Sequence, residues 1–106
     1  MAKPKSTRVE RRASQRARDK LTQKREKLWA LEPGGSAHRP IEIESSSLVE
    51  PRSEAEPCLR CDGEVRNVEH RAETLGTARL RIASVRCVRC GYERTFHFRL
   101  VVDAPN

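Results

Sequence analysis

Four cysteines constrain this chain more than any other feature of its sequence. They form two identically spaced pairs, Cys58-Leu59-Arg60-Cys61 and Cys87-Val88-Arg89-Cys90, and no other cysteine occurs among the 106 residues. A pair spaced in this way can place both sulfurs on one side of a tight turn, here called a knuckle. The 25 residues between the pairs are enough for a β-hairpin that brings the knuckles together. Zn²⁺ accepts such a cage of four thiolates readily, so the spacing predicts one structural zinc ion held by Cys58, Cys61, Cys87 and Cys90.

A glycine accompanies each knuckle. Gly91 directly follows Cys90, and Gly63 follows Cys61 after Asp62. We expect a positive φ at both glycines, which lets backbone N–H groups point at the sulfurs and share their negative charge. Because four protein ligands leave no open coordination position, the predicted ion would stabilise the fold and would not activate a water molecule.

Three other uses of the cysteines stay open. A redox-active CxxC motif should open a helix within a βαβ unit, whereas the sequence around both pairs is typical of strands and turns. Two disulfides need an oxidising compartment, and the basic N-terminus lacks the hydrophobic stretch of a secretion signal. Iron in a rubredoxin-like cage takes the same four sulfurs as zinc, so the sequence does not separate the two metals.

The composition limits the size of the apolar core. Charged residues make up 35% of the chain and aromatic residues 4%, with a mean hydropathy of −0.78. Small domains with so little apolar core need an additional stabilising element, which the metal supplies. No apolar run approaches the roughly 20 residues of a membrane-spanning helix. We therefore expect a cytoplasmic protein with no membrane contact.

Charge is distributed unevenly along the chain. Residues 1–31 hold eleven lysines and arginines against three acidic residues, a net charge of +8. Residues 32–57 hold two against six, or −4, and residues 58–106 hold nine against six, or +3. This asymmetry indicates distinct functional segments. The predicted organisation is a basic helical arm (1–34), a flexible acidic linker with room for a short strand (35–57), a zinc ribbon (58–102) and a tail (103–106).

The arm carries helix-forming residues without Gly or Pro from Ser6 to Leu31. Thr7 and Glu10 have the spacing of a capping box, and Pro33-Gly34-Gly35 should end the helix. Apolar residues at helical spacing form a thin stripe, made of Val9, Ala13, Ala17, Leu21, Leu28 and Leu31.

Alternating residues predict the strands. They span 65–72, 79–86 and 92–102, with a turn over 73–77 and Gly76 as its positive-φ residue. In the last strand we expect Phe96, Phe98, Leu100 and Val102 to share one face. The acidic and apolar residues of 40–44 suit either a flexible spacer or an added edge strand. The predicted fold is thus a small metal-stabilised β fold: a three-stranded antiparallel ribbon with an N-terminal basic α-helical arm.

The motifs Cys58-x-x-Cys61-Asp-Gly and Cys87-x-x-Cys90-Gly-Tyr, joined by a hairpin, resemble the Cys₄ zinc-ribbon group of folds over about the last 48 residues. The resemblance implies a fold and a metal but no function, because zinc ribbons occur in many unrelated proteins. The spacing is similar to that of transcription elongation factor ribbons that stimulate RNA cleavage. That family needs an Asp-Glu pair at the hairpin tip, where this chain has only Glu73.

The basic arm predicts contact with the phosphates of RNA or DNA. The candidate residues are Arg8, Arg11, Arg12, Arg16, Arg18, Lys20, Lys24, Arg25 and Lys27. The competing prediction is a docking module of a larger protein or nucleoprotein assembly, with the 40–44 segment adding a strand to a partner. No catalytic arrangement is visible, so we expect no enzyme. His70 and His97 are predicted to be strand residues, and Trp29 to pack on the ribbon.

Overall fold

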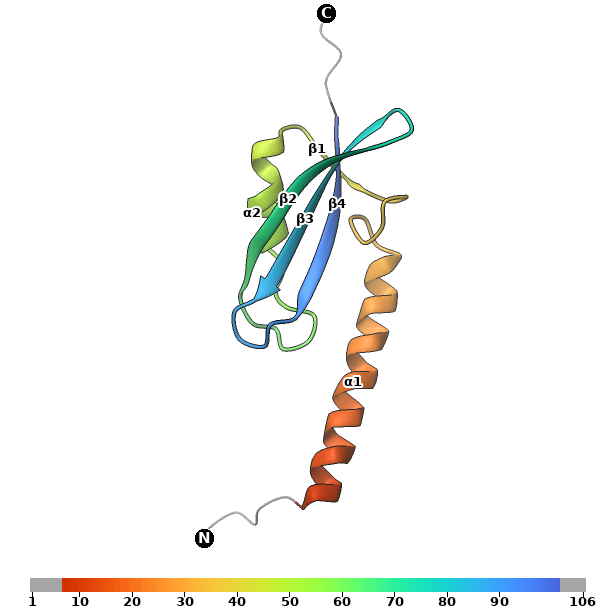
Figure 1. Cartoon of the computed structure of the whole chain (residues 1–106). Helices are drawn as coiled ribbons and strands as arrows, with labels where there is room; N and C mark the ends of the chain where they lie inside the picture. Colours follow the sequence, from red (N-terminus) through yellow and green to blue (C-terminus); the bar gives the residue numbers. More distant parts are fainter. Residues whose placement is uncertain (1–6, 102–106) are drawn as a thin grey trace, which may run out of the picture.

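The computed structural model describes residues 7–101, which form one long helix beside a small sheet (Figure 1). Helix α1 spans Arg8–Ala30, and a 3₁₀ turn at Ser46–Leu48 leads into the short helix α2 (Val49–Glu54). The strands are β1 (Ile41–Ile43), β2 (Val65–Leu75), β3 (Ala78–Cys87) and β4 (Glu93–Leu100). Within residues 7–101, no helix has the length and hydrophobicity needed to span a bilayer.

The ends of α1 follow the sequence signals. The Thr7 hydroxyl accepts a hydrogen bond from the Glu10 amide, and the Glu10 carboxylate accepts one from the Thr7 amide, both at 3.1 Å. This confirms the predicted capping box, which satisfies two amides that the helix leaves unpaired. Beyond the helix, Gly34 is buried with φ +94°, and a Cβ there would lie 2.6 Å from Cδ1 of Ile41. Only glycine fits this turn toward β1.

The sheet has four strands in a mixed arrangement, so the predicted three-stranded antiparallel sheet is wrong. The strand order is β1-β4-β3-β2, and β2, β3 and β4 are antiparallel as expected. The additional strand, β1, pairs parallel with β4, with Ile41 opposite Phe98 and Ile43 opposite Leu100. The outer edge of β4 presents backbone groups that need partners, and β1 supplies them from the segment expected to be a spacer or a strand.

The β2–β3 hairpin is longer than predicted and its turn is tighter. Pairing continues to Leu75 opposite Ala78, so only Gly76 and Thr77 remain in the turn. Gly76 has the predicted positive φ, +62°, which suits a two-residue turn that follows the twist of the strands. In β4, Phe96 and Phe98 share one face, as predicted, and both are buried, whereas Val102 lies outside the described residues.

Helix α2 lies in the segment predicted to be a linker. Pro51 stands in the first turn of this six-residue helix, where a missing N–H costs nothing because that amide would have no partner within the helix. Val49 and Ser53 are fully buried. The helix thus covers the sheet instead of spanning a gap between two parts of the chain.

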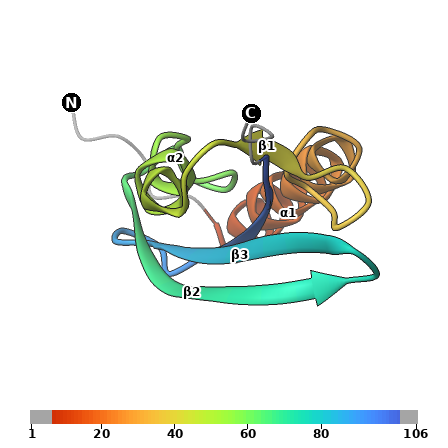
Figure 2. The same cartoon turned by 90° about the horizontal axis from the view of Figure 1, so that it is seen from above.

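The core lies between the sheet and the elements on one side of it. Seen from above, α1, α2 and β1 lie on the same side of the β2–β3 hairpin (Figure 2). Phe96 and Phe98 of β4 belong to one buried cluster with Val49 of α2, and this cluster also includes Cys58 and Cys87. The apolar core and the cysteine-bearing end of the sheet are therefore one continuous unit.

Candidate metal centre

The two knuckles, residues 58–63 and 87–92, bring all four cysteine sulfurs together at one end of the sheet. All four Sγ atoms lie within 4.8 Å of one another. The Sγ atoms of Cys58 and Cys90 are 3.6 Å apart, and those of Cys61 and Cys87 are 3.4 Å apart. A tetrahedron with metal–sulfur bonds of about 2.3 Å has sulfur–sulfur edges of about 3.8 Å. The cluster therefore has the donor set and the size of a closed four-sulfur metal site.

The knuckles turn in the same way. The Asp62 amide donates to the Cys58 carbonyl at 2.9 Å, and the Gly91 amide donates to the Cys87 carbonyl at 3.0 Å. Gly91 has the predicted positive φ of +77°, but in the first knuckle the positive φ of +60° falls on Asp62 and not on Gly63. The reason is positional: each of these residues directly follows the second cysteine of its pair. Aspartate is one of the few residues other than glycine that visits this conformation.

Gly63 has a different role, which is to leave room for the sulfurs. A Cβ at this position would lie 3.1 Å from Sγ of Cys61 and 3.1 Å from Sγ of Cys87. A side chain would therefore press on two of the four candidate ligands at once. The glycine is required by this close approach and not by its backbone conformation.

Backbone amides point at the sulfurs, as predicted. The Arg60 amide lies 3.3 Å from Sγ of Cys58, and the amides of Arg89 and Cys90 lie 3.4 and 3.5 Å from Sγ of Cys87. Such donors stabilise a thiolate. The Cys90 amide, followed by that of Arg89, lowers the pKa of Cys87 to about 6 against the opposing effect of burial.

The other thiol of the closest pair holds its proton tightly. Its hydrogen bond to Cys87 raises the pKa of Cys61 to about 12, and burial raises the pKa of Cys58. The shifts at Cys61 and Cys87 thus run in opposite directions, and the hydrogen bond between the two thiols contributes to both. A metal ion has to displace this proton, so its binding is linked to pH.

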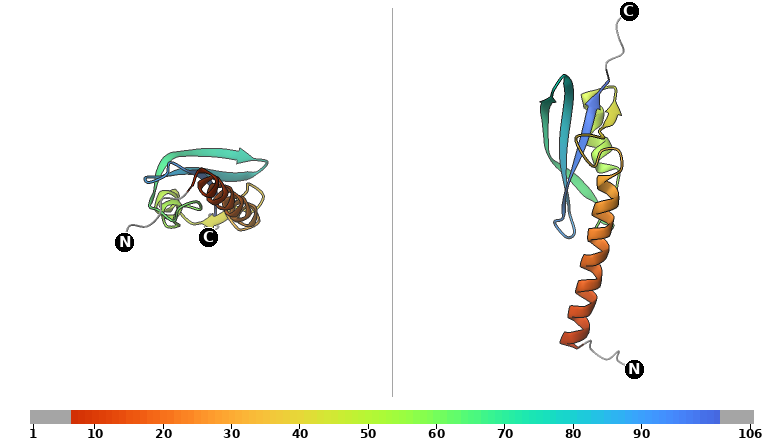
Figure 3. Two further views of the ribbon diagram at one scale, coloured as in Figure 1. Left: turned by 90° about the horizontal axis from the view of Figure 1, so that it is seen from below. Right: turned by 90° about the vertical axis from the view of Figure 1, so that its right-hand side faces the viewer.

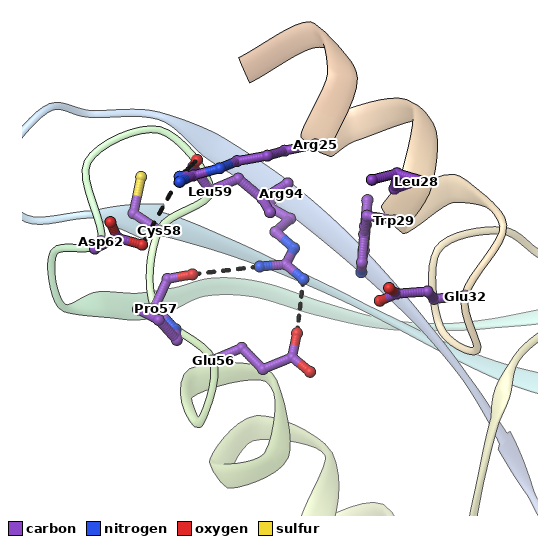
Figure 4. Close-up of a pocket in the computed structure, with 10 residues that line it drawn as sticks. All are labelled: Arg25, Leu28, Trp29, Glu32, Glu56, Pro57, Cys58, Leu59, Asp62 and Arg94. Carbon is purple, nitrogen blue, oxygen red and sulfur yellow. Dashed lines mark hydrogen bonds and ion pairs between the residues drawn. The ribbon is translucent and has the colours of Figure 1, made fainter. Parts of the chain in front are cut away.

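Helix α1 meets the ribbon at the knuckles. Nη1 of Arg25 donates to the Leu59 carbonyl at 2.8 Å and lies 3.9 Å from the Asp62 carboxylate, as the close-up shows (Figure 4). The Tyr92 hydroxyl donates to Oε1 of Glu26 at 2.7 Å. Near the C-terminal end of the helix, Trp29 packs edge-on against Phe96 with ring centroids 5.4 Å apart. This packing confirms the predicted role of the tryptophan.

A buried arginine links Trp29 to the first knuckle. The guanidinium of Arg94 lies 4.5 Å from the ring centroids of both Trp29 and Phe96. Its Nη2 donates to Glu56 at 2.6 Å and its Nη1 to the Pro57 carbonyl at 3.3 Å. Arg94 and its partners Trp29, Glu56 and Pro57 line a cleft of about 340 Å³ between α1 and the first knuckle. Sequence analysis missed Arg94, whose only signal is its place beside the aromatic positions of a strand.

The predicted nucleic-acid residues lie along α1, and eight of the nine are exposed. The exception, Arg25, is half-buried by its contacts with the first knuckle. His70 and His97 lie in β2 and β4, as expected, and neither belongs to the cysteine cluster. The N-terminal half of α1 extends past the cysteine-bearing end of the sheet (Figure 3).

No family model matches the chain, and neither does any curated protein or solved structure. The resemblance to zinc ribbons therefore depends on the knuckles and the hairpin themselves. The structure establishes a small β-rich fold in which four cysteines are clustered closely enough to hold a metal ion.

Proposed function

We propose that the protein is a non-catalytic zinc-ribbon protein that contacts RNA or DNA through α1. One observation carries the nucleic-acid part: a stripe of exposed, unpaired cations that runs along one side of α1. This cation stripe consists of Arg12, Arg16, Lys20, Lys24 and Lys27. All five residues are exposed, and among residues 7–101 none of their side chains forms an ion pair or hydrogen bond.

Helix geometry explains the position of the stripe. Its members are three or four residues apart, so they follow one face of a helix with 3.6 residues per turn. Two of the residues that meet the ribbon, Arg25 and Trp29, lie two residues from Lys27 on either side. Two residues are about half a turn, which directs the lysine away from the ribbon. Docking of α1 on the ribbon thus leaves the cation stripe accessible to a large anionic partner.

Phosphate contact fits this charge pattern. Each cation that neutralises a phosphate releases counterions, and affinity then falls steeply as the salt concentration rises. The stripe offers long, flexible side chains and no motif that would read base edges. The proposed contact is therefore one with the phosphate backbone, common to RNA and DNA, and independent of base sequence.

The test is a binding titration of the full chain against generic RNA and duplex DNA at two salt concentrations. A variant with Arg16, Lys20 and Lys24 changed to glutamine keeps good helix formers while it removes three charges from the stripe. We expect weaker binding and a slope of log affinity against log salt that is shallower by up to about 3, since each phosphate contact contributes about 0.9.

The matched control removes the same charge from the β2–β3 hairpin. Replacement of Arg66, Arg71 and Arg79 by glutamine gives the same net charge as the cation-stripe variant. All three side chains are exposed. This variant should retain the binding of the wild-type protein. Equal losses in both variants would indicate attraction by net charge alone, and the absence of binding at low salt would refute nucleic-acid contact.

A specific observation also favours the second candidate function, a protein-docking module. Three leucines of α1 and its C-terminal boundary are strongly exposed: Leu21 at 50%, Leu28 at 64% and Leu31 at 66%. Exposed apolar side chains in a row are typical of helices that bind in a groove of a partner. Charge-to-glutamine changes in the cation stripe would leave such docking intact, whereas changes at the leucines would abolish it.

The metal part of the proposal is one structural Zn²⁺ bound by Cys58, Cys61, Cys87 and Cys90. The four-sulfur donor set, the backbone N–H groups directed at sulfur and the closed arrangement support it. Metal analysis of the purified protein should find one zinc ion per chain in a colourless sample. A coloured, iron-containing protein would instead support a rubredoxin-like centre, because iron takes the same ligands.

A further inference from the structure

We infer that the metal centre and the docking of α1 are coupled: metal binding at the knuckles fixes α1 against the ribbon, and the docked helix tightens metal binding. The inference rests on the proposed metal site and is independent of nucleic-acid contact. It assigns to the metal a second role, the orientation of the basic helix.

The first support is the location of the contacts. Within residues 7–101, every polar side-chain contact between α1 and the ribbon ends on a knuckle. Arg25 reaches the Leu59 carbonyl, which lies between the first two candidate ligands. Glu26 accepts from Tyr92, two residues beyond the last ligand, Cys90. Closer to the N-terminus of the helix, the Asp19 carboxylate lies 3.9 Å from the guanidinium of Arg60 in the first knuckle.

The aromatic contact depends on the first knuckle as well. Trp29 stacks on the guanidinium of Arg94, and Arg94 donates to the carbonyl of Pro57. Pro57 is the residue before Cys58, so the chain that enters the first knuckle also sets the position of Arg94 (Figure 4). Displacement of this segment would remove one side of the stack that holds Trp29.

The second support is that α1 has little else to hold it in place. None of its residues is buried, and its leucines are exposed instead of packed on the sheet. In proteins most of the stability of a helix comes from packing of its apolar face, and α1 buries little of its own. Its order and direction therefore depend on the few contacts made by residues 19–29. In the metal-free chain the knuckles lose the ligand bonds that fix their turns, and these contacts lose their partners.

Coupling of this kind is reciprocal, which makes it measurable. If metal binding favours docking, loss of docking must weaken metal binding by the same factor. The experiment measures Zn²⁺ affinity of the full chain by competition with a chromophoric chelator. Trp29, the only tryptophan, reports docking through its fluorescence. The test variant combines Arg25→Gln with Tyr92→Phe, which removes two contacts without changing a cysteine.

We expect the double variant to bind Zn²⁺ about 5- to 30-fold more weakly than wild type, within the usual range of coupling between two sites. Arg79→Gln, which removes the same charge at an exposed position near the turn of the β2–β3 hairpin, should have wild-type affinity. Hydrogen exchange of the α1 amides should accelerate when Zn²⁺ is removed from the wild-type protein. If the double variant fails to fold, Tyr92→Phe alone should still weaken Zn²⁺ binding about threefold.

The outcomes separate the two proposals. Equal Zn²⁺ affinity in wild type and the docking variants would overturn the coupling and leave the metal site standing. A wild-type chain that binds no Zn²⁺ would overturn the metal site and the coupling together. Unchanged exchange of the α1 amides on metal removal would show that the helix does not depend on the knuckles, and would likewise overturn the coupling.

Discussion

The Tyr92 hydroxyl donates a hydrogen bond of 2.7 Å to Oε1 of Glu26, although the two residues are 66 positions apart in the chain. Both side chains are half-buried at the junction of the second knuckle and α1. The phenol must be protonated to donate, and a phenolate would face the carboxylate with like charge. Burial, followed by the hydrogen bond and the charge of Glu26, accordingly raises the pKa of Tyr92.

Tyr92 should ionise at a higher pH in the native protein than in the unfolded chain. Because the native pKa lies above the ordinary value of about 10, its stabilising contribution is complete below pH 10 and is lost as pH rises through the native pKa. Phenolate absorbance measures this directly, since Tyr92 is the only tyrosine. Glu26→Gln should lower the native pKa part of the way, and identical native and denatured titrations would contradict the prediction.

Replacement of any candidate ligand should unfold the ribbon. In a small metal-stabilised domain, metal binding contributes on the order of 10 kcal/mol to folding. Cys87→Ser should therefore lose the dispersed NMR signals of β2 to β4 and the bound metal together. Val88→Ala, at a side chain that is 62% exposed in the same knuckle, is the control and should remain native. A native spectrum from a chain that lacks all four cysteines would refute a structural metal.

Two glycine substitutions should distinguish a glycine that is needed for lack of space from one that is needed for its positive φ. Gly63→Ala places a methyl group 3.1 Å from two sulfurs, so it should weaken metal affinity. Gly76→Ala meets no atom within 4 Å but keeps a φ of +62°, so it should cost about 1–2 kcal/mol of folding free energy with unchanged metal affinity. Metal competition and urea unfolding of both variants provide the comparison. Metal affinity that is unchanged in Gly63→Ala would show that the sulfurs do not require this space.

Arg94→Lys should destabilise the protein although the charge is kept. A lysine ammonium can reach Glu56 but lacks the planar guanidinium that lies 4.5 Å from the ring centroids of both Trp29 and Phe96. We expect a loss of about 1–2 kcal/mol in urea unfolding of the metal-loaded protein. Arg99→Lys is the matched control, because the exposed pair of Arg99 with Glu42 contributes about 0–1 kcal/mol. Equal stability of the two variants would remove the stack as a stabilising contact.

The cluster of four cysteines could be predicted from the sequence because its signal is both local and chemical. Two pairs with the same spacing limit where four sulfurs can go, and the hairpin between them follows from alternation. The position of the positive φ in the first knuckle, at Asp62 and not Gly63, was harder to predict. This position depends on the register of the turn. A glycine nearby tolerates a positive φ, but its presence in the sequence does not show which residue of the turn adopts it.

The docking of α1 could not be read from hydrophobic periodicity. The apolar stripe suggests Leu21 and Leu28 as contact residues, yet the helix meets the ribbon through Arg25, Glu26 and Trp29. Hydrogen bonds to a carbonyl and a hydroxyl leave no periodic signal in the sequence. Likewise, the parallel partner of β1 depends on which edge of the sheet is free, a property of the assembled fold.

The pairing of β1 with β4 also has a consequence for the order in which the molecule forms. Glu42 and Arg99, paired across these strands, are separated by 57 residues, whereas each neighbouring pair in β2, β3 and β4 closes through a short loop. Contacts between distant residues form late because a long loop must close first. β1 is synthesised before β4, so it has no strand partner until the hairpins that follow it in the chain have folded.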